Sequence, residues 1–367
     1  MIAVIDISST SLSMTVLEDE TYKPVYKFRE GLSTISYIED GKVSEHGIEK
    51  IADRIAIFQD QCIKLGVEKL YVLSTAAMRF ISNADEVFTI IRERTGANII
   101  QLDGETEAYC DCAANQSFKD MSAPIVVDIG GASIELCDLT KEGRKGIKCL
   151  EFGALTLKHK FVKSVYPNKE ECAKIKKYLK KAFGKLDFHG KADKNADCTA
   201  VLVGATNRSI YEIYRDYYDI PESEDMTIDT DKLNKLAKKL VEAPDRSHLL
   251  IKNAPEKIYF IVVAILTLVQ ILKTIPFKTV VVSDSGVKEG FLRLVSAGEI
   301  KAELSALKPE KSEKEISSVE ELAEHIKNRQ KAAKKGKKSS SESSEKPQQT
   351  KQGKGKSHKD STTEKID

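Results

Sequence analysis

A repeated strand–turn–strand pattern constrains this chain more than any other feature. Residues 4–11 read VIDISSTS, and residues 127–133 read VDIGGAS. Each copy is an apolar run that ends in Asp and continues through small residues into a second alternating run, at 12–16 or 134–139. The pattern predicts two β-hairpins whose turns carry no bulky side chain, so that backbone N–H groups can approach an anion. An Asp at the strand end can hold the cation that accompanies a phosphate.

Helical and strand patterns alternate along the rest of the chain. Amphipathic helices are expected at 48–62, 83–94, 168–183 and 231–241, and buried strands at 69–74, 99–102, 199–203 and 279–282. This order, with a length of 367 residues, predicts an α/β fold of two domains. The apolar run 258–272 is too short to span a bilayer, so it is expected to be a buried helix.

The charge is distributed unevenly along the chain. Residues 328–367 carry 12 Lys or Arg against 5 Asp or Glu, whereas the remainder carries 46 against 51. The tail consists almost entirely of Lys, Ser, Gly, Gln, Glu and Thr, so it is expected to be disordered, either as a solvated linker or as a segment that contacts polyanions. The expected organisation is a first domain at 1–121, a second at 122–305, a helix within 306–327 and the tail at 328–367.

The cysteines and the N-terminus suggest a location. The seven cysteines have no zinc-site spacing, and the chain starts directly in a strand without a recognisable secretory signal. Reduced thiols in a cytoplasmic protein are therefore expected.

Seven short segments occur in an order that is typical of one enzyme family. They are residues 6–11, 74–79, 103–108, 128–135, 152–154, 204–206 and 283–290. On these segments the chain resembles the exopolyphosphatase/guanosine pentaphosphatase (Ppx/GppA) family over residues 1–300. The resemblance implies an actin/hexokinase-like fold of two ribonuclease-H-like domains, with the active site in the interdomain cleft. It also suggests a homodimer.

The same resemblance implies roles for individual residues. Glu107 matches the catalytic glutamate, which would take a proton from the attacking water. The implied ligands of Mg²⁺, with Mn²⁺ as the alternative, are Asp6, Asp128 and Glu135. The implied phosphate-binding residues are Ser9, Ser11, Arg79, Gly130, Gly131, Ser133, Gly204 and Thr206.

Several positions depart from the family pattern. Ser13 and Thr156 stand where the family commonly has arginine, and Lys257-Ile258-Tyr259 replaces its usual Arg-Ala-Asp. The acids are retained better than the arginines. Lys158, His159 and Lys160 either restore part of the lost positive charge or form a solvated helix face.

Three functions follow from this pattern. The first is a metal-dependent exophosphatase that releases the terminal phosphate of inorganic polyphosphate, with guanosine pentaphosphate as the alternative substrate. The second is a catalytically weak regulatory protein that binds either ligand. The third is a sugar or acetate kinase of the same superfold, although no adenine pocket or acceptor site is recognisable.

Overall fold

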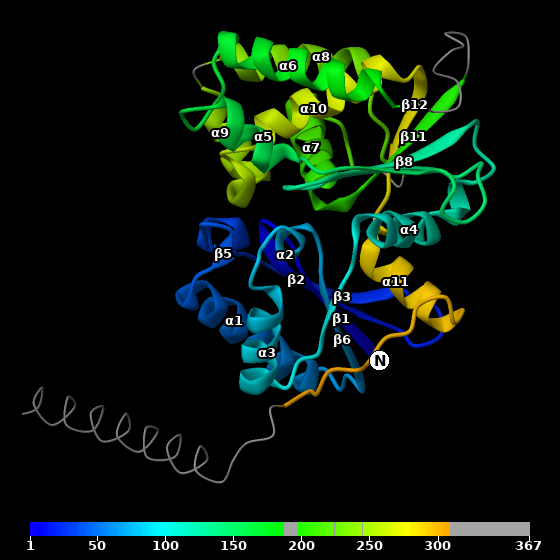
Figure 1. Ribbon diagram of the computed structural model, residues 1–367. Coiled ribbons are helices and arrows are strands. Elements are labelled where there is room, and N and C mark those ends of the chain that lie inside the picture. Colours follow the sequence, from blue (N-terminus) through cyan, green and yellow to red (C-terminus); the bar gives the residue numbers. More distant parts are fainter. Residues whose placement is uncertain (187–196, 223–224, 244, 309–367) are drawn as a thin grey trace, which may run out of the picture. The chain divides into compact units, whose positions relative to one another are not determined.

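Two five-stranded sheets with the same strand order form the centre of the molecule. The computed structural model describes residues 1–186, 197–222, 225–243 and 245–308 (Figure 1). The first sheet has the order β3 (Pro24–Gly31), β2 (Ser11–Leu17), β1 (Ile2–Ile7), β6 (Lys69–Ser74) and β7 (Ile99–Gln101). The second has the order β10 (Ile147–Leu150), β9 (Ile134–Asp138), β8 (Pro124–Ile129), β11 (Cys198–Val203) and β12 (Phe277–Val282).

The hairpin expected at each copy of the repeat is present. In the first sheet, β2 pairs antiparallel with β1 and β3, whereas β6 pairs parallel with β1 and β7. In the second sheet, β9 pairs antiparallel with β8 and β10, whereas β11 pairs parallel with β8 and β12. Asp6 pairs with Ser13 across β1 and β2, and Asp128 pairs with Glu135 across β8 and β9. The repeat in sequence is therefore a repeat in topology and in register.

The strands of the first sheet are apolar on both sides because helices cover both faces. Ile5 and Ile7 pack toward α1 (Glu45–Lys64) and α3 (Ala84–Thr95), whereas Val4 packs with residues of α4 (Gly104–Ala114) and α11 (Val287–Ser296). Successive side chains of a strand point to opposite faces, which explains this division. The expected helices at 48–62 and 83–94 and the expected strand at 69–74 are confirmed.

The second sheet carries its larger core on one face. Its helices are α5 (Ala154–Phe161), α6 (Lys169–Gly184), α7 (Gly204–Tyr217), α8 (Thr230–Glu242), α9 (Arg246–Asn253) and α10 (Ile261–Thr274). Ten residues of α10 are buried, so the prediction of a buried helix near 258–272 is confirmed. Among the described residues, no helix has the length and apolarity needed to cross a membrane.

Short elements complete the fold. They are η1 (Thr34–Tyr37), β4 (Ile38–Glu39), β5 (Lys42–Val43), α2 (Ala76–Arg79), η2 (Gln116–Phe118) and η3 (Pro255–Lys257).

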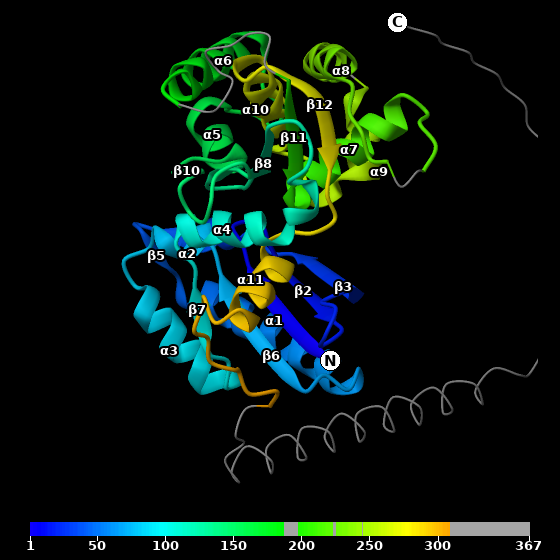
Figure 2. The same cartoon turned by 90° about the vertical axis from the view of Figure 1, so that its right-hand side faces the viewer.

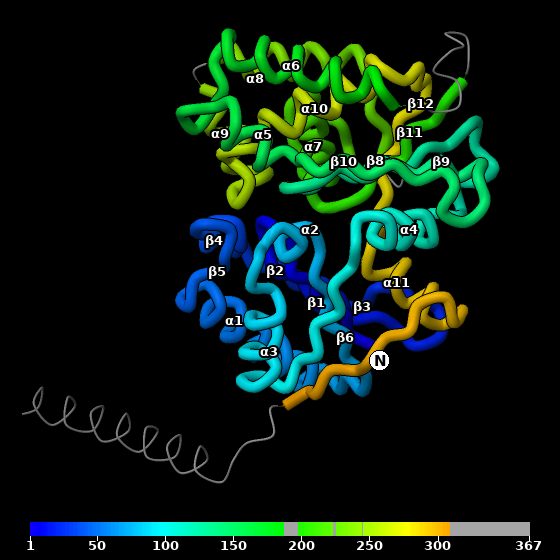
Figure 3. The backbone as a smooth tube through the Cα atoms, viewed as in Figure 1, coloured from blue at the N-terminus to red at the C-terminus, as the bar shows by residue number. Residues whose placement is uncertain are grey.

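Helix α4 lies between the two sheets (Figures 2 and 3). Its Cys110 packs into the core of the first sheet, and its Cys112 packs against Val126 and Val201 of the second. Helix α11 follows the last strand of the second sheet but packs on α4 and β1, and Ser305 forms a bridge with Leu70. The range expected for the second domain, 122–305, therefore ends with a segment that packs against the first sheet.

The C-terminal expectations fall mostly beyond the described residues. Residues 306–308 are not helical. The rest of the helix expected within 306–327 and the whole basic tail at 328–367 lie outside the described residues and stay predictions.

Candidate active site

The two hairpin turns approach each other directly. Each turn is closed by the same backbone hydrogen bond. In the first turn the N–H of Ser8 donates to the carbonyl oxygen of Ser11 (3.0 Å), and in the second the N–H of Gly130 donates to the carbonyl oxygen of Ser133 (2.9 Å). A Cβ added to Gly131 would lie 3.0 Å from Cγ2 of Thr10, so only a glycine fits this approach without a shift. The turns thus border one space from opposite sides.

A cavity of about 370 Å³ opens between these turns. The predicted site residues that line it are Asp6, Ser9, Glu107, Asp128, Gly130, Gly131, Ser133, Gly204 and Thr206. The other three, Ser11, Arg79 and Glu135, are not part of its wall. The Oγ of Ser11 lies 3.1 Å from the Oγ of Ser8, so this side chain supports its own turn.

Glu107 reaches the cavity because of where α4 begins. Oδ1 of Asp103 accepts a hydrogen bond from the N–H of Thr106 (2.7 Å) and so caps the helix directly after β7. Glu107 therefore lies in the first turn, with only 8% of its surface exposed. Burial raises its pKa to about 7, although the positive charge of Arg79 opposes the shift.

Arg79 connects Glu107 to the second hairpin from behind the cavity wall. Its Nη1 donates to Oε2 of Glu107 (2.5 Å) and to the oxygen of Leu102 (3.1 Å). Its Nη2 donates to Oγ of Ser133 (3.1 Å) and lies 3.5 Å from Oε1 of Glu135. The guanidinium thus orients the carboxylate of Glu107, whereas the family resemblance implied that it binds phosphate.

The strand-end acids are buried and strongly perturbed. Burial raises the pKa of Asp128 to about 7, although Arg208 opposes the shift. Burial also raises the pKa of Glu135 well above its usual range, and the neighbouring Glu107 and Asp128 add to this shift. These carboxylates accumulate negative charge that a cation would neutralise.

A magnesium ion fits the chemistry of this donor pair. Among the described residues, no group of three or more His, Cys, Asp or Glu has the geometry of a metal site. Mg²⁺, however, is commonly held by one or two carboxylates together with water and substrate phosphates. Asp128 and Glu135 are direct cross-strand neighbours, and within the described residues the carboxylate oxygens of Glu135 accept no hydrogen bond, although Arg79 lies 3.5 Å from Oε1.

The loop at Gly204 supports Asp128. Gly204 has φ of +81°, and a Cβ there would lie 2.2 Å from Oδ1 of Asp128. Glycine is therefore required both by the backbone conformation and by the carboxylate. Next to it, Nδ2 of Asn207 donates to the oxygens of Val127 and Val203, both at 2.8 Å, and so fixes the end of β8.

Five basic residues on the cavity wall were not predicted as a group from the sequence. They are Lys27, Arg29, Arg208, Lys257 and Lys288. Burial lowers the pKa of Lys257 to about 8, and the charge of Arg29 adds to this shift. The charge of Arg208 also lowers the pKa of Lys257, so these basic side chains lie close to one another. Arg208, one turn after Gly204, and Lys288, within 283–290, could have been found from their motifs; Arg29 carried no such signal.

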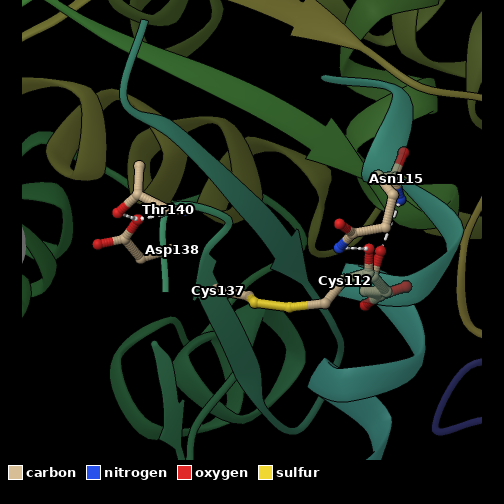
Figure 4. The surroundings of a disulfide bond; sticks show 7 residues. Cys112, Asn115, Cys137, Asp138 and Thr140 are labelled. Atoms are coloured by element: carbon tan, nitrogen blue, oxygen red, sulfur yellow. Dashed lines mark hydrogen bonds between the residues drawn. A yellow bond between two sulfur atoms is a disulfide. The ribbon is translucent and has the colours of Figure 1, made fainter. Parts of the chain in front are cut away.

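A disulfide joins Cys112 of α4 to Cys137 of β9 (Figure 4). The expectation that all thiols are reduced is therefore wrong for this pair, because two cysteines 25 positions apart meet where α4 packs on the second sheet. Cys62, Cys110, Cys149 and Cys172 are free thiols. The bond links α4, which carries Glu107, to β9, which carries Glu135.

Another buried acid of α4 was not anticipated. Asp111 lies one helical turn after Glu107 and is 1% exposed, and neither of its carboxylate oxygens has a hydrogen-bond partner. Burial raises its pKa well above the usual range, and Asp128 and Glu107 reinforce the shift.

Proteins of similar sequence provide the context for this site. "Exopolyphosphatase 1" of Mycobacterium tuberculosis (strain H37Rv) is 24% identical over 184 residues, which are 48% of this chain and 54% of that protein. The "guanosine-5'-triphosphate,3'-diphosphate pyrophosphatase" of Aliivibrio fischeri (strain MJ11) is 27% identical over 164 residues, or 42% and 32% of the two chains. The chain thus spans about half the length of the mycobacterial relative that it matches, and less of the other.

Solved structures share the fold. The crystal structure of an exopolyphosphatase from Cytophaga hutchinsonii has a TM-score of 0.71 at 19% identity, covering 81% of this chain and 98% of the other. The Aquifex aeolicus member of the Ppx/GppA family has a TM-score of 0.64 at 22% identity, covering 82% and 99%. The sequence model of the Ppx/GppA phosphatase family matches residues 4–297, which include both hairpins and the cavity between them. The chain therefore belongs to the Ppx/GppA phosphatase family.

Proposed function

We propose that this protein is a metal-dependent exophosphatase that hydrolyses the terminal phosphoanhydride of inorganic polyphosphate and releases phosphate. The observation that carries the proposal is the placement of Glu107. Its carboxylate lies at a cavity that is also lined by two turns of small residues and by five basic side chains. A buried carboxylate with a pKa of about 7 is well suited to accept a proton near neutral pH.

In this proposal the residues of the chain divide the chemistry. Glu107 takes the proton of the water that attacks the terminal phosphorus, and Arg79 keeps the carboxylate oriented. Ser9, Ser133 and Thr206 offer hydroxyl groups to phosphate oxygens from three elements around the cavity. Asp128 and Glu135 are the proposed ligands of Mg²⁺, with Asp6 in a supporting position opposite them, and the ion would supply charge neutralisation at the phosphate oxygens when bound.

The basic residues of the cavity wall supply positive charge in place of the arginines that the family commonly has at the positions of Ser13 and Thr156. Lys288 donates to Oγ of Ser13 (3.0 Å), so a lysine from α11 occupies the place beside this serine. Arg208 and Arg29 lie on the same wall. These residues are proposed to bind the phosphates that precede the scissile bond.

Guanosine pentaphosphate is the second candidate substrate. The Aliivibrio fischeri relative, whose name specifies a guanosine phosphate, is slightly more identical to this chain than the mycobacterial one. Both substrates present a terminal phosphoanhydride, so the same residues would serve either reaction. The shared strand order also supports two ribonuclease-H-like, actin-like domains with the active site between them.

The test is phosphate release by the purified protein with Mg²⁺. Tripolyphosphate, long-chain polyphosphate and guanosine pentaphosphate are compared, each with wild type, Glu107→Gln and Glu105→Gln. Glu105 is an exposed acid two positions away, so it is the matched control. We expect Glu107→Gln to lower kcat by about 10²- to 10⁴-fold and Glu105→Gln to have no effect.

Two results would contradict the proposal. Release that persists in Glu107→Gln would remove this residue from catalysis. Absence of release with all three compounds, while the wild type still binds them, would leave a regulatory phosphate-binding protein.

A further inference from the structure

A line of lysines leads away from the cavity along two helices of the second half. α5 carries Lys158 and Lys160 near its end, and six lysines lie on α6: Lys169, Lys174, Lys176, Lys177, Lys180 and Lys181. Residues 1–327 together carry more acidic than basic residues, 51 against 46. This concentration of positive charge is therefore a local feature, not a general property of the folded part.

Helix α5 starts at the active-site turn. The N–H groups of Leu155 and Thr156 donate to the oxygen of Gly131 at 2.9 and 3.1 Å. The helix has eight residues, so at 1.5 Å per residue it extends about 12 Å from the turn. Lys158 and Lys160 thus lie roughly one short helix length from the cavity.

Lys160 links α5 to α6. Its Nζ lies 4.5 Å from the ring centroid of Tyr178, which is a cation–π contact between the two helices. Lys174 and Lys181 lie one helical turn before and after Tyr178, so they flank it on the same face of α6. The lysines of α5 and those of α6 around Tyr178 therefore lie next to each other on the surface.

These lysines have few charged partners. Lys174 pairs with Glu170 at 2.6 Å, in an exposed pair of a kind that contributes little to stability. Within the part of the chain that the structure describes, Lys158, Lys160, Lys177 and Lys181 have no ion-pair partner. Lys160, Lys177 and Lys181 are also exposed, and Lys158 is half-buried.

We propose that this α5–α6 track, formed by Lys158, Lys160, Lys177 and Lys181, binds the distal part of a long linear polyphosphate chain whose end occupies the cavity. The inference rests on the proposed function and adds a chain-length preference to it. Lysine ammonium groups pair with phosphates as point charges and need no fixed geometry, which suits a flexible polyanion. Short chains would fill the cavity without reaching α6.

The test compares two quadruple variants with the same change in charge. The first replaces Lys158, Lys160, Lys177 and Lys181 by Gln. The second, the control, replaces four exposed lysines outside α5 and α6, namely Lys119, Lys141, Lys145 and Lys148. KM and kcat are measured for long-chain polyphosphate and for tripolyphosphate at several salt concentrations.

We expect the track variant to raise KM for long chains by about 10-fold and to flatten its salt dependence, because fewer counterions are displaced on binding. Its kinetics with tripolyphosphate should stay within about 2-fold of wild type, and the control should match wild type on both substrates. Equal losses on long and short chains, or an equal loss in the control, would overturn the track.

A direct binding measurement tests this inference independently of the proposed function. Association of long-chain polyphosphate is also measured directly in the Glu107→Gln background, with and without the four track substitutions. Weaker binding after these substitutions supports the track even if no phosphate is ever released. Unchanged binding overturns it, as does a loss that appears only with single-stranded DNA of matched charge.

Discussion

The two hairpins share one backbone but differ in how their charge is compensated. Asp6 faces Ser13 across the first hairpin, and Asp128 faces Glu135 across the second. Lys288 donates to Ser13, and its charge partly offsets the rise that burial causes in the pKa of Asp6. At the second hairpin, burial and the acids Glu107 and Asp128 raise the pKa of Glu135, and Arg79 offsets this shift only in part.

The comparison shows how a duplicated element can acquire two roles. In the proposed function, the Ser with a lysine beside it would bind phosphate oxygens at the first hairpin, whereas the Asp–Glu pair would bind a cation at the second. The turn residues follow the same division. Ser9 brings a hydroxyl group to the cavity, and Gly131 lets the opposite turn approach it.

The largest expected effect separates the two strand-end acids. Asp128→Asn should lower kcat for phosphate release by about 10³-fold, because it removes one of two paired cation ligands worth several kcal/mol. Asp6→Asn should cost only about 10-fold, a supporting role of the kind seen for residues around a metal site. Both are measured across a titration of Mg²⁺. Equal losses in the two variants would show that the hairpins have the same role.

The disulfide is a second difference, because it anchors only the second hairpin. Replacing Cys112 and Cys137 together by Ser should lower the free energy of unfolding by about 3 kcal/mol, given a loop of 25 residues. Chemical denaturation measures the change, with Cys149→Ser, an exposed free thiol, as the control. A double variant as stable as wild type would show that packing of α4 alone holds Glu107 near Glu135.

A smaller effect is expected at the glycine beside Asp128. Gly204→Ala should destabilise the protein by about 2 kcal/mol, because alanine is strained at positive φ and its Cβ meets the carboxylate. Gly184→Ala is the control, since no atom of the described residues lies within 4 Å of a Cβ at this helical position. The control should instead be slightly more stable. Thermal melting distinguishes the two, and a harmless Gly204→Ala would mean that Asp128 can move away.

The smallest expected effect is a dependence of stability on pH. The pKa values of Glu107 and Asp128 are raised to about 7 from 4.5 and 3.8, so the folded state binds more protons than the unfolded state between these limits. Their contribution to stability is therefore lost as pH rises toward 7. The melting temperature without metal should therefore fall as the pH rises from about 4 to just above 7.

Mg²⁺ should oppose this fall, because a cation favours the ionised carboxylates. The Asp128→Asn variant should show a shallower fall than wild type, and Asp6→Asn should resemble wild type more closely. A melting temperature that is independent of pH and of Mg²⁺ would show that Arg79 and Arg208 fully compensate the acids of the second hairpin.

Much of the local structure could be predicted from the sequence because its signals are local. The apolar runs before Asp6 and Asp128 indicated β1 and β8, and the spacing of apolar residues indicated α1, α3, α6 and α8. Strand and helix periodicity depend only on neighbouring positions, so one sequence is enough to detect them. The less regular strand β3 and the short strand β10 were not predicted, because both are edge strands with partly exposed residues and so lack a clear apolar pattern.

The sequence by itself determined the duplicated hairpins, the acids at their strand ends and the segment 103–108 that carries Glu107. Only the tertiary structure decided that Arg79 holds Glu107 against the second hairpin, that Cys112 meets Cys137, and that α11 returns to the first sheet with Lys288. These contacts join residues from 25 to 275 positions apart. They depend on how packed sheets and helices bring distant side chains together, and no local pattern of residues encodes that arrangement.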